Sequence, residues 1–227
     1  MTGNTHRADI VAVMGATGSG KSSTICVALA ANPAPRLMVW DFKREYRAFG
    51  LPYTTQKPLY DRVAAAGAGP FRVVFHPSFD VDQGRVQFDW FCKVAHAAGD
   101  VLVIADELHR VMLSGWSPAG WGQLVCLGRA RGVRIIAASQ RPAGIEKGFW
   151  DQASVIRSGR LNGKASAQAV AGVLLVPWQE VVALPPLHWI QRSIYTPAVV
   201  RGRIEWRGGR PHDVVLSKKP LPGASAP

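Results

Sequence analysis

The sequence predicts an α/β fold in which helices flank a mainly parallel central sheet. Apolar runs of strand length alternate along the chain with longer segments of helical pattern, as in folds built from βαβ units. One run, residues 101–106, is apolar on both faces, which is typical of a central parallel strand. A glycine-rich segment, residues 15–20, joins the first apolar run to a helical pattern. These three observations favour one doubly covered sheet.

The first half of the chain supplies four of the expected strands. Short apolar runs bounded by polar residues or by Gly and Pro place them at residues 10–15, 36–41, 71–76 and 101–106. Helical patterns separate them at residues 20–31, 57–66 and 81–98. A Gly-Ala-Gly-Pro sequence ends the second of these helices, and Gly99 ends the third.

The second half continues the alternation and then changes character. Helices are expected at residues 121–131 and 164–173, and strands at 133–139 and 153–158. From about residue 187 the chain has the pattern of short strands. The expected organisation is an N-terminal extension at 1–8, one domain at 9–210, and a basic, disordered tail at 211–227.

Composition and charge limit the class of protein. The chain has 227 residues, 48% of them hydrophobic and 19% charged, so disorder is excluded for most of it. The net charge of +12 favours a polyanionic partner, either nucleic acid or an anionic membrane surface, over a charge that serves solubility alone. Eight basic residues oppose two acidic ones between positions 129 and 164, and seven oppose two after position 191. Such clusters suit sequence-independent contacts with phosphate groups.

Neither a disulfide framework nor a membrane anchor is expected. The three cysteines are far apart and have no metal-ligand spacing. The longest apolar stretch has ten residues, 169–178, whereas a spanning helix needs about 20. The N-terminus has no apolar segment typical of a signal peptide. We therefore expect a soluble protein without a membrane span.

The sharpest motif is a phosphate-binding loop at residues 15–22, which fits the pattern GxxxxGK[ST]. A chance glycine-rich turn would lack the strand before it and the helix after it. Lys21 is expected to reach the β- and γ-phosphates of ATP, and the Ser22 hydroxyl to bind Mg²⁺. The residues expected to bind the nucleotide are Gly15, Ala16, Thr17, Gly18, Ser19, Gly20, Lys21, Ser22 and Ser23.

Two adjacent carboxylates follow the strand at residues 101–106. Asp106, at the strand end, fits a ligand of the Mg²⁺ ion, and Glu107 fits a general base that orients the attacking water. The alternative, an aspartate that merely caps a helix, is weaker after a phosphate-binding loop. A GTPase would carry an NKxD-type base-reading motif, and the sequence has none.

A third motif surrounds the strand at residues 133–139. Gln140 follows the strand and suits a sensor of the γ-phosphate or of the attacking water, while Arg129 lies on the helix before it. Arg129 could reach the nucleotide of a neighbouring subunit, or it could be a solvated charge that interacts favourably with the helix dipole. Gln140 could likewise be an ordinary polar loop residue. His109, two residues after Glu107, is interpreted as structural.

Together these motifs resemble the FtsK/HerA superfamily of DNA-pumping ATPases. The resemblance covers about residues 8–192, and its main signatures lie at 128–142, 39–46, 156–174 and 184–190. It implies a RecA-like (ASCE) P-loop NTPase that works as a homo-oligomeric ring, usually a hexamer. It also implies that Asp106 and Glu107 are the metal and base acids, that Gln140 is the sensor, and that Arg129 acts in trans on a neighbouring subunit's ATP.

Within that superfamily the chain is most similar to the tectivirus-type genome-packaging ATPases. This likeness implies an ATP-hydrolysing translocase that drives double-stranded viral DNA into a preformed capsid. Its partners would be duplex DNA, further copies of itself, and proteins of the capsid portal or packaging vertex. It would act in the host cytoplasm or at the virion's packaging vertex. A Zot-like assembly ATPase of a filamentous phage and, in another class, a P-loop small-molecule kinase stay open as alternatives.

Overall fold

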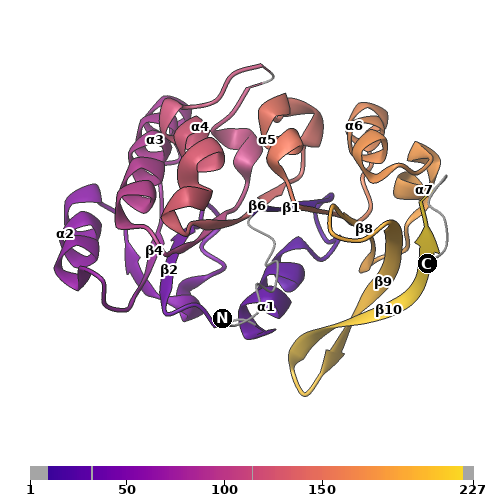
Figure 1. Cartoon of the computed structure of the whole chain (residues 1–227), viewed down its shortest axis with the longest axis horizontal. Helices are drawn as coiled ribbons and strands as arrows, with labels where there is room; N and C mark the ends of the chain where they lie inside the picture. Colours follow the sequence, from indigo (N-terminus) through magenta and orange to yellow (C-terminus); the bar gives the residue numbers. More distant parts are fainter. Residues whose placement is uncertain (1–9, 32, 114, 222–227) are drawn as a thin grey trace.

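A computed structural model describes residues 10–31, 33–113 and 115–221 of the chain. In these ranges ten strands form one sheet in the order β10-β9-β8-β7-β1-β6-β5-β2-β4-β3 (Figure 1). The strands are β1 (Ile10–Met14), β2 (Arg36–Trp40), β3 (Leu51–Tyr53), β4 (Phe71–Phe75), β5 (Leu102–Ala105), β6 (Arg134–Ser139), β7 (Val155–Ser158), β8 (His188–Ser193), β9 (Ala198–Arg207) and β10 (Arg210–Pro220).

The sheet has a parallel part and an antiparallel part. From β7 through β1 to β3, each strand is parallel to its neighbours. From β7 to β10, each pair is antiparallel. The mainly parallel α/β sheet predicted from the sequence is therefore confirmed.

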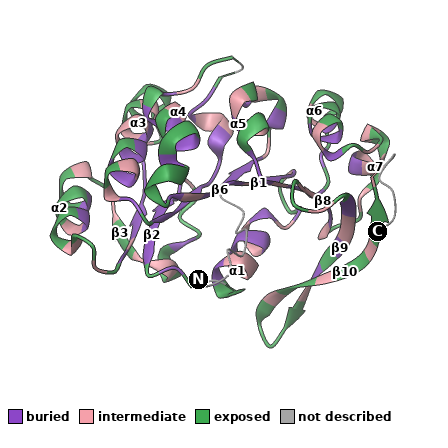
Figure 2. Ribbon diagram, in the orientation of Figure 1, coloured by how far each residue is buried: buried purple, intermediate pink, exposed green. Residues whose placement is uncertain are grey.

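Seven α-helices in the described ranges cover the two faces unequally. They are α1 (Lys21–Ala31), α2 (Gln56–Ala66), α3 (Val81–Ala98), α4 (Ala119–Leu127), α5 (Lys147–Gln152), α6 (Lys164–Leu174) and α7 (Trp178–Ala183). Helices α2 to α7 contribute to the core on one face, and α1 packs against the other (Figures 1 and 2). Among these helices, none combines the length and apolar character that crossing a bilayer requires.

The alternation of side chains along the strands explains the two cores. In β2, Met38 and Trp40 belong to the core beneath α2–α7, while Leu37 and Val39 belong to the core beneath α1. All four are buried, as the continuous apolar pattern of a doubly covered parallel strand predicts. This arrangement fixes the carboxyl ends of β1, β2, β5 and β6 along one edge of the sheet.

Two expectations about local structure were wrong in part. Residues 211–220, expected as part of a disordered tail, form most of β10 and pair with β9. The run Val214-Val215-Leu216 gives this segment strand character. The polar residues that follow can continue the strand, because backbone hydrogen bonds do not depend on apolar side chains. The helix expected at 121–131 ends at Leu127 and continues as a 3₁₀ turn, Gly128–Arg131. The expected extension at 1–8 and the last residues of the tail lie outside the described residues.

Candidate active site

The glycine-rich loop leaves the carboxyl end of β1 and enters α1 in a conformation that favours glycine. Gly15 and Gly20 have φ values of 155° and 94°. A Cβ atom on Gly15 would lie 2.2 Å from Ser19 Oγ and 3.0 Å from Ser19 Cβ, so a side chain there would displace Ser19. The Ala16 amide also donates to the Arg160 carbonyl over 2.7 Å, which ties the loop to the end of β7. The predicted loop therefore has the tight turn that a phosphate-binding loop requires.

Lys21 is buried against this loop. Its ammonium donates to the carbonyl oxygens of Gly15, over 2.8 Å, and Ala16, over 3.1 Å. Burial lowers the pKa of Lys21, although the nearby charge of Glu107 opposes that shift. The ammonium thus lies over the loop, held by bonds that phosphate oxygens can replace.

Asp106 follows β5 and is almost fully buried. Its Oδ2 atom has no hydrogen-bond partner among the described residues. Burial, reinforced by the charge of Glu107, raises the pKa of Asp106 to about 7. A buried carboxylate oxygen without a partner is costly unless a cation or donor joins it in the working state.

Glu107 is buried beside Asp106 and has a left-handed backbone, with φ 54° and ψ 43°. Its carboxylate forms an ion pair with Lys43 and accepts a hydrogen bond from the Gln140 amide. Burial alone would raise the pKa of Glu107, but the bonds from Lys43 and Gln140 outweigh it and hold that pKa below its usual range. Glu107 is therefore a carboxylate at neutral pH, as a general base must be.

Gln140 bridges the loop and the base. It follows β6, donates to Glu107, and accepts a hydrogen bond of 2.8 Å from the Thr17 hydroxyl. A side chain in this position changes its contacts when either the loop or Glu107 changes partner. The geometry fits the sensor expected from the sequence.

A segment after β2 completes the same edge of the sheet. Asp41 is fully buried, and its two carboxylate oxygens accept the backbone N–H groups of Glu45 and Tyr46, each over 2.9 Å. This turn carries Lys43 to Glu107 and Glu45 to the Ser22 hydroxyl, which donates to it over 2.5 Å.

The residues present fit a magnesium ion bound together with a nucleotide. The unpartnered Asp106 Oδ2 and the Ser22 hydroxyl both lie where the parallel strands have their carboxyl ends, and hard oxygen donors are the ligands that Mg²⁺ prefers. One or two protein oxygens suffice when phosphate oxygens and water supply the others. Within the described residues no cluster of three or more His, Cys, Asp or Glu side chains forms a metal cage.

Comparison with known proteins assigns the chain to a family. No protein-family model matches the chain. Protein P9 of Pseudoalteromonas phage PM2 is 31% identical over 177 residues, which cover 76% of this chain and 78% of the relative. The chain belongs to the P9 family.

Several solved structures have a fold similar to that of this chain. The genome-packaging NTPase B204 of Sulfolobus turreted icosahedral virus 2, in complex with ATP-gammaS, matches with a TM-score of 0.66 and 18% identity, covering 86% of this chain and 96% of that one. The cytoplasmic domain of the type VII secretion ATPase EccC of Thermomonospora curvata matches with a TM-score of 0.52 and 22% identity, covering 86% of this chain and 25% of that one. The chain therefore shares the fold of a viral genome-packaging NTPase and of a secretion ATPase, which confirms the expected fold.

Of the residues expected to be catalytic, Arg129 alone lies away from the site. It lies in the 3₁₀ turn before β6, and therefore at the amino end of that strand, whereas the glycine-rich loop and Gln140 lie at the carboxyl edge. It lines a separate hollow with Asp151 and Gln152. A role for Arg129 in ATP hydrolysis therefore requires a second subunit, as the sequence resemblance implies.

Sequence reasoning missed Lys43, Glu45 and the position of His109. The segment at 39–46 is recognisable in the sequence, but its ion pair with Glu107 depends on β2 lying beside β5. His109, interpreted as structural, has Nδ1 3.3 Å from a carboxylate oxygen of Glu107 and 3.3 Å from the Ser139 hydroxyl. Its spacing of two residues from Glu107 was the available signal.

Proposed function

We propose that this protein hydrolyses ATP. The observation that carries the proposal is the carboxylate of Glu107, buried within one bonded network with the phosphate-binding loop through Gln140 and Thr17. A poised general base beside a phosphate cradle is the arrangement that hydrolysis of a phosphoanhydride needs. The fold shared with B204, whose structure contains ATP-gammaS, supports it.

The residues divide the chemistry between them. Lys21 exchanges its loop carbonyls for β- and γ-phosphate oxygens and neutralises their charge. Glu107, once it leaves Lys43, accepts a hydrogen bond from the attacking water and takes its proton. Ser22 and Asp106 would hold Mg²⁺, which supplies further charge neutralisation at the phosphates when bound. Gln140 couples the loop to Glu107, because it is hydrogen-bonded to both Thr17 and Glu107.

We further propose that hydrolysis drives double-stranded DNA into a preformed viral capsid. The net charge of +12 supports a polyanionic partner, and the named activity of B204 as a genome-packaging NTPase supports this one. In this proposal the chains form a ring, each supplying Arg129 to its neighbour's ATP. The ring docks on portal or packaging-vertex proteins in the host cytoplasm.

Phosphate release from ATP, with and without duplex DNA, tests the proposal. The wild-type chain should hydrolyse ATP in the presence of Mg²⁺, and duplex DNA should stimulate the rate. Glu107→Gln should abolish turnover, whereas Asp61→Asn, an exposed carboxylate on α2 paired with Lys57, should leave it unchanged. Transfer of phosphate to a small-molecule acceptor would instead establish the kinase alternative, and the absence of any turnover would contradict the proposal.

A further inference from the structure

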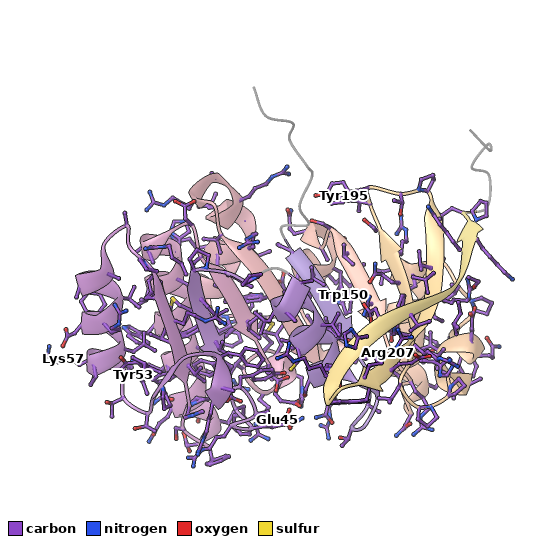
Figure 3. The ribbon with its side chains drawn as sticks, turned by 90° about the horizontal axis from the view of Figure 1, so that it is seen from below. Glu45, Tyr53, Lys57, Trp150, Tyr195 and Arg207 are labelled. Carbon is purple, nitrogen blue, oxygen red and sulfur yellow. The ribbon has the colours of Figure 1, made fainter. Side chains whose placement is uncertain are left out.

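The β9–β10 hairpin packs directly on the phosphate-binding loop. A Cβ atom on Gly20 would lie 2.9 Å from Ile204 Cδ1 and 3.3 Å from Leu187 Cδ2. The Ile204 amide donates to the Leu187 carbonyl over 2.9 Å, which joins β9 to the segment before β8. Figures 1 and 3 show the hairpin extending beside α1, and Figure 3 labels Arg207 near its turn. The C-terminal strands therefore form a wall of the loop's surroundings.

This wall ends in a large exposed aromatic side chain. Trp206 lies two residues after Ile204 on β9, so both side chains lie on the same face of the strand. Trp206 is 58% exposed, whereas Ile204 is buried and lies next to Gly20 of the loop. A tryptophan exposed to this extent loses apolar contact with water when a flat ligand covers it.

Trp206 and Leu187 line one pocket with the loop. The pocket has a volume of about 280 Å³, and its walls also include Lys21, Ser22 and Ser23. In the proposed function Lys21 binds the β- and γ-phosphates and the loop backbone binds the α- and β-phosphates, so the phosphates lie on the loop side of this pocket. The nucleoside then extends towards the side formed by Leu187 and Trp206.

We propose that Trp206 and Leu187 hold the nucleotide's base by stacking and apolar contact. The proposal rests on the proposed function, because it takes the nucleotide's phosphates to bind at the loop. Stacking recognises the flat face of a base and not the hydrogen-bonding groups at its edge. The site therefore favours the larger purines over pyrimidines and separates adenine from guanine only weakly.

Equilibrium binding to the full-length chain tests this, with a non-hydrolysable ATP analogue and inorganic tripolyphosphate as the two ligands. Base–aromatic stacking contributes about 1–3 kcal/mol, so Trp206→Ala should weaken affinity for the analogue about 5- to 150-fold. It should leave tripolyphosphate affinity unchanged, because that ligand has no base. Trp206→Phe keeps an aromatic face and should retain most of the affinity. Tyr60→Ala, an exposed aromatic on α2, is the matched control and should bind both ligands as the wild type does.

The outcomes separate this inference from the proposed function. If Trp206→Ala binds the analogue as tightly as the wild type while tripolyphosphate also binds, stacking is wrong and the phosphate site stands. Equal weakening of both ligands would show that Trp206 supports the loop's shape, which also overturns stacking. If the wild type binds neither ligand, the proposed ATPase function itself fails. A wild-type preference for the ATP analogue over the matching CTP analogue that disappears in Trp206→Ala would support the purine preference.

Discussion

In the proposed mechanism Lys21 and Glu107 act on different states of the reaction, so substitutions should separate their effects. Lys21→Ala removes a cation that binds phosphate in the ground state and should weaken ATP affinity about 10- to 100-fold. Glu107→Gln keeps a side chain of the same shape and should retain ATP affinity while turnover falls at least about 100-fold.

Isothermal titration with ATP and a phosphate-release assay measure the two effects on the same preparations. Equal losses of ATP affinity in both variants would contradict these assignments. Asp61→Asn serves as the control for a change of one carboxylate far from the loop.

The sequence predicts the role of an individual residue well when that role depends on its immediate neighbours in the chain. The glycine-rich loop, Asp106 and Glu107 follow strands directly, so their place at one sheet edge follows from the strands alone. The role of Lys43 was not predicted, because its partner Glu107 lies 64 residues later in the chain, after β5. The two meet only because β5 pairs with β2 in the sheet. Trp206 escaped for the same reason, since only the hairpin's path carries it to Gly20.

Among the secondary-structure elements, α7 and β9 are joined by a two-pronged ion pair. Arg201 donates from Nε and Nη2 to the two carboxylate oxygens of Glu180, over 2.5 and 2.9 Å. Hydrogen bonds from Arg201 lower the pKa of Glu180 below its ordinary value of 4.5. A lowered carboxylate pKa stabilises the fold above the ordinary pKa, and that stability is lost as pH falls through the lowered one.

Glu180→Gln should therefore destabilise the protein by about 1 kcal/mol at pH 7, since the pair is only partly shielded from water. The difference from wild type should shrink as the pH falls below 4.5 and disappear once Glu180 is protonated in both the folded and unfolded states. Urea unfolding at several pH values measures this. A difference that stays constant into acid would show that the ion pair contributes nothing. The exposed Lys57–Asp61 pair, removed by Asp61→Asn, gives the small reference effect.

Prediction of elements from sequence succeeded where hydrophobic pattern and length agreed. The helix Val81–Ala98 begins at the capping residue Asp80 and ends at Gly99, so both ends are marked in the sequence. Strand β10 was missed because its alternation is weak, with exposed polar residues along most of its length. Its stability comes from pairing with β9, and a non-local partner leaves little trace in the segment's own composition.

The position of Arg129 in the whole molecule requires assembly of several subunits if this residue is to act in catalysis. Since it lies at the sheet edge opposite the loop, it can reach an ATP only on another subunit. Arg129→Ala should then leave ATP binding nearly intact and reduce turnover about 1,000-fold or more, which is the contribution of an arginine finger. Mixing Arg129→Ala and Glu107→Gln chains should restore part of the activity, because some joints in a mixed ring contain both groups.

Phosphate release from the mixture, compared with each variant alone, measures that complementation. Full activity of Arg129→Ala would show that the residue is no finger, and Arg131 would be examined next. No recovery on mixing, with ring assembly verified by light scattering, would contradict action in trans.

If ATP hydrolysis moves this protein along duplex DNA, as we propose, displacement of a triplex-forming strand measures that movement directly. A labelled third strand is bound at one end of a long duplex, and its release is followed after the protein and ATP are added. We expect release of the third strand to require ATP and Mg²⁺, to be independent of the duplex sequence, to weaken steeply with salt, and to be lost in Glu107→Gln. ATP hydrolysis without any displacement, by chains verified as assembled rings, would contradict it.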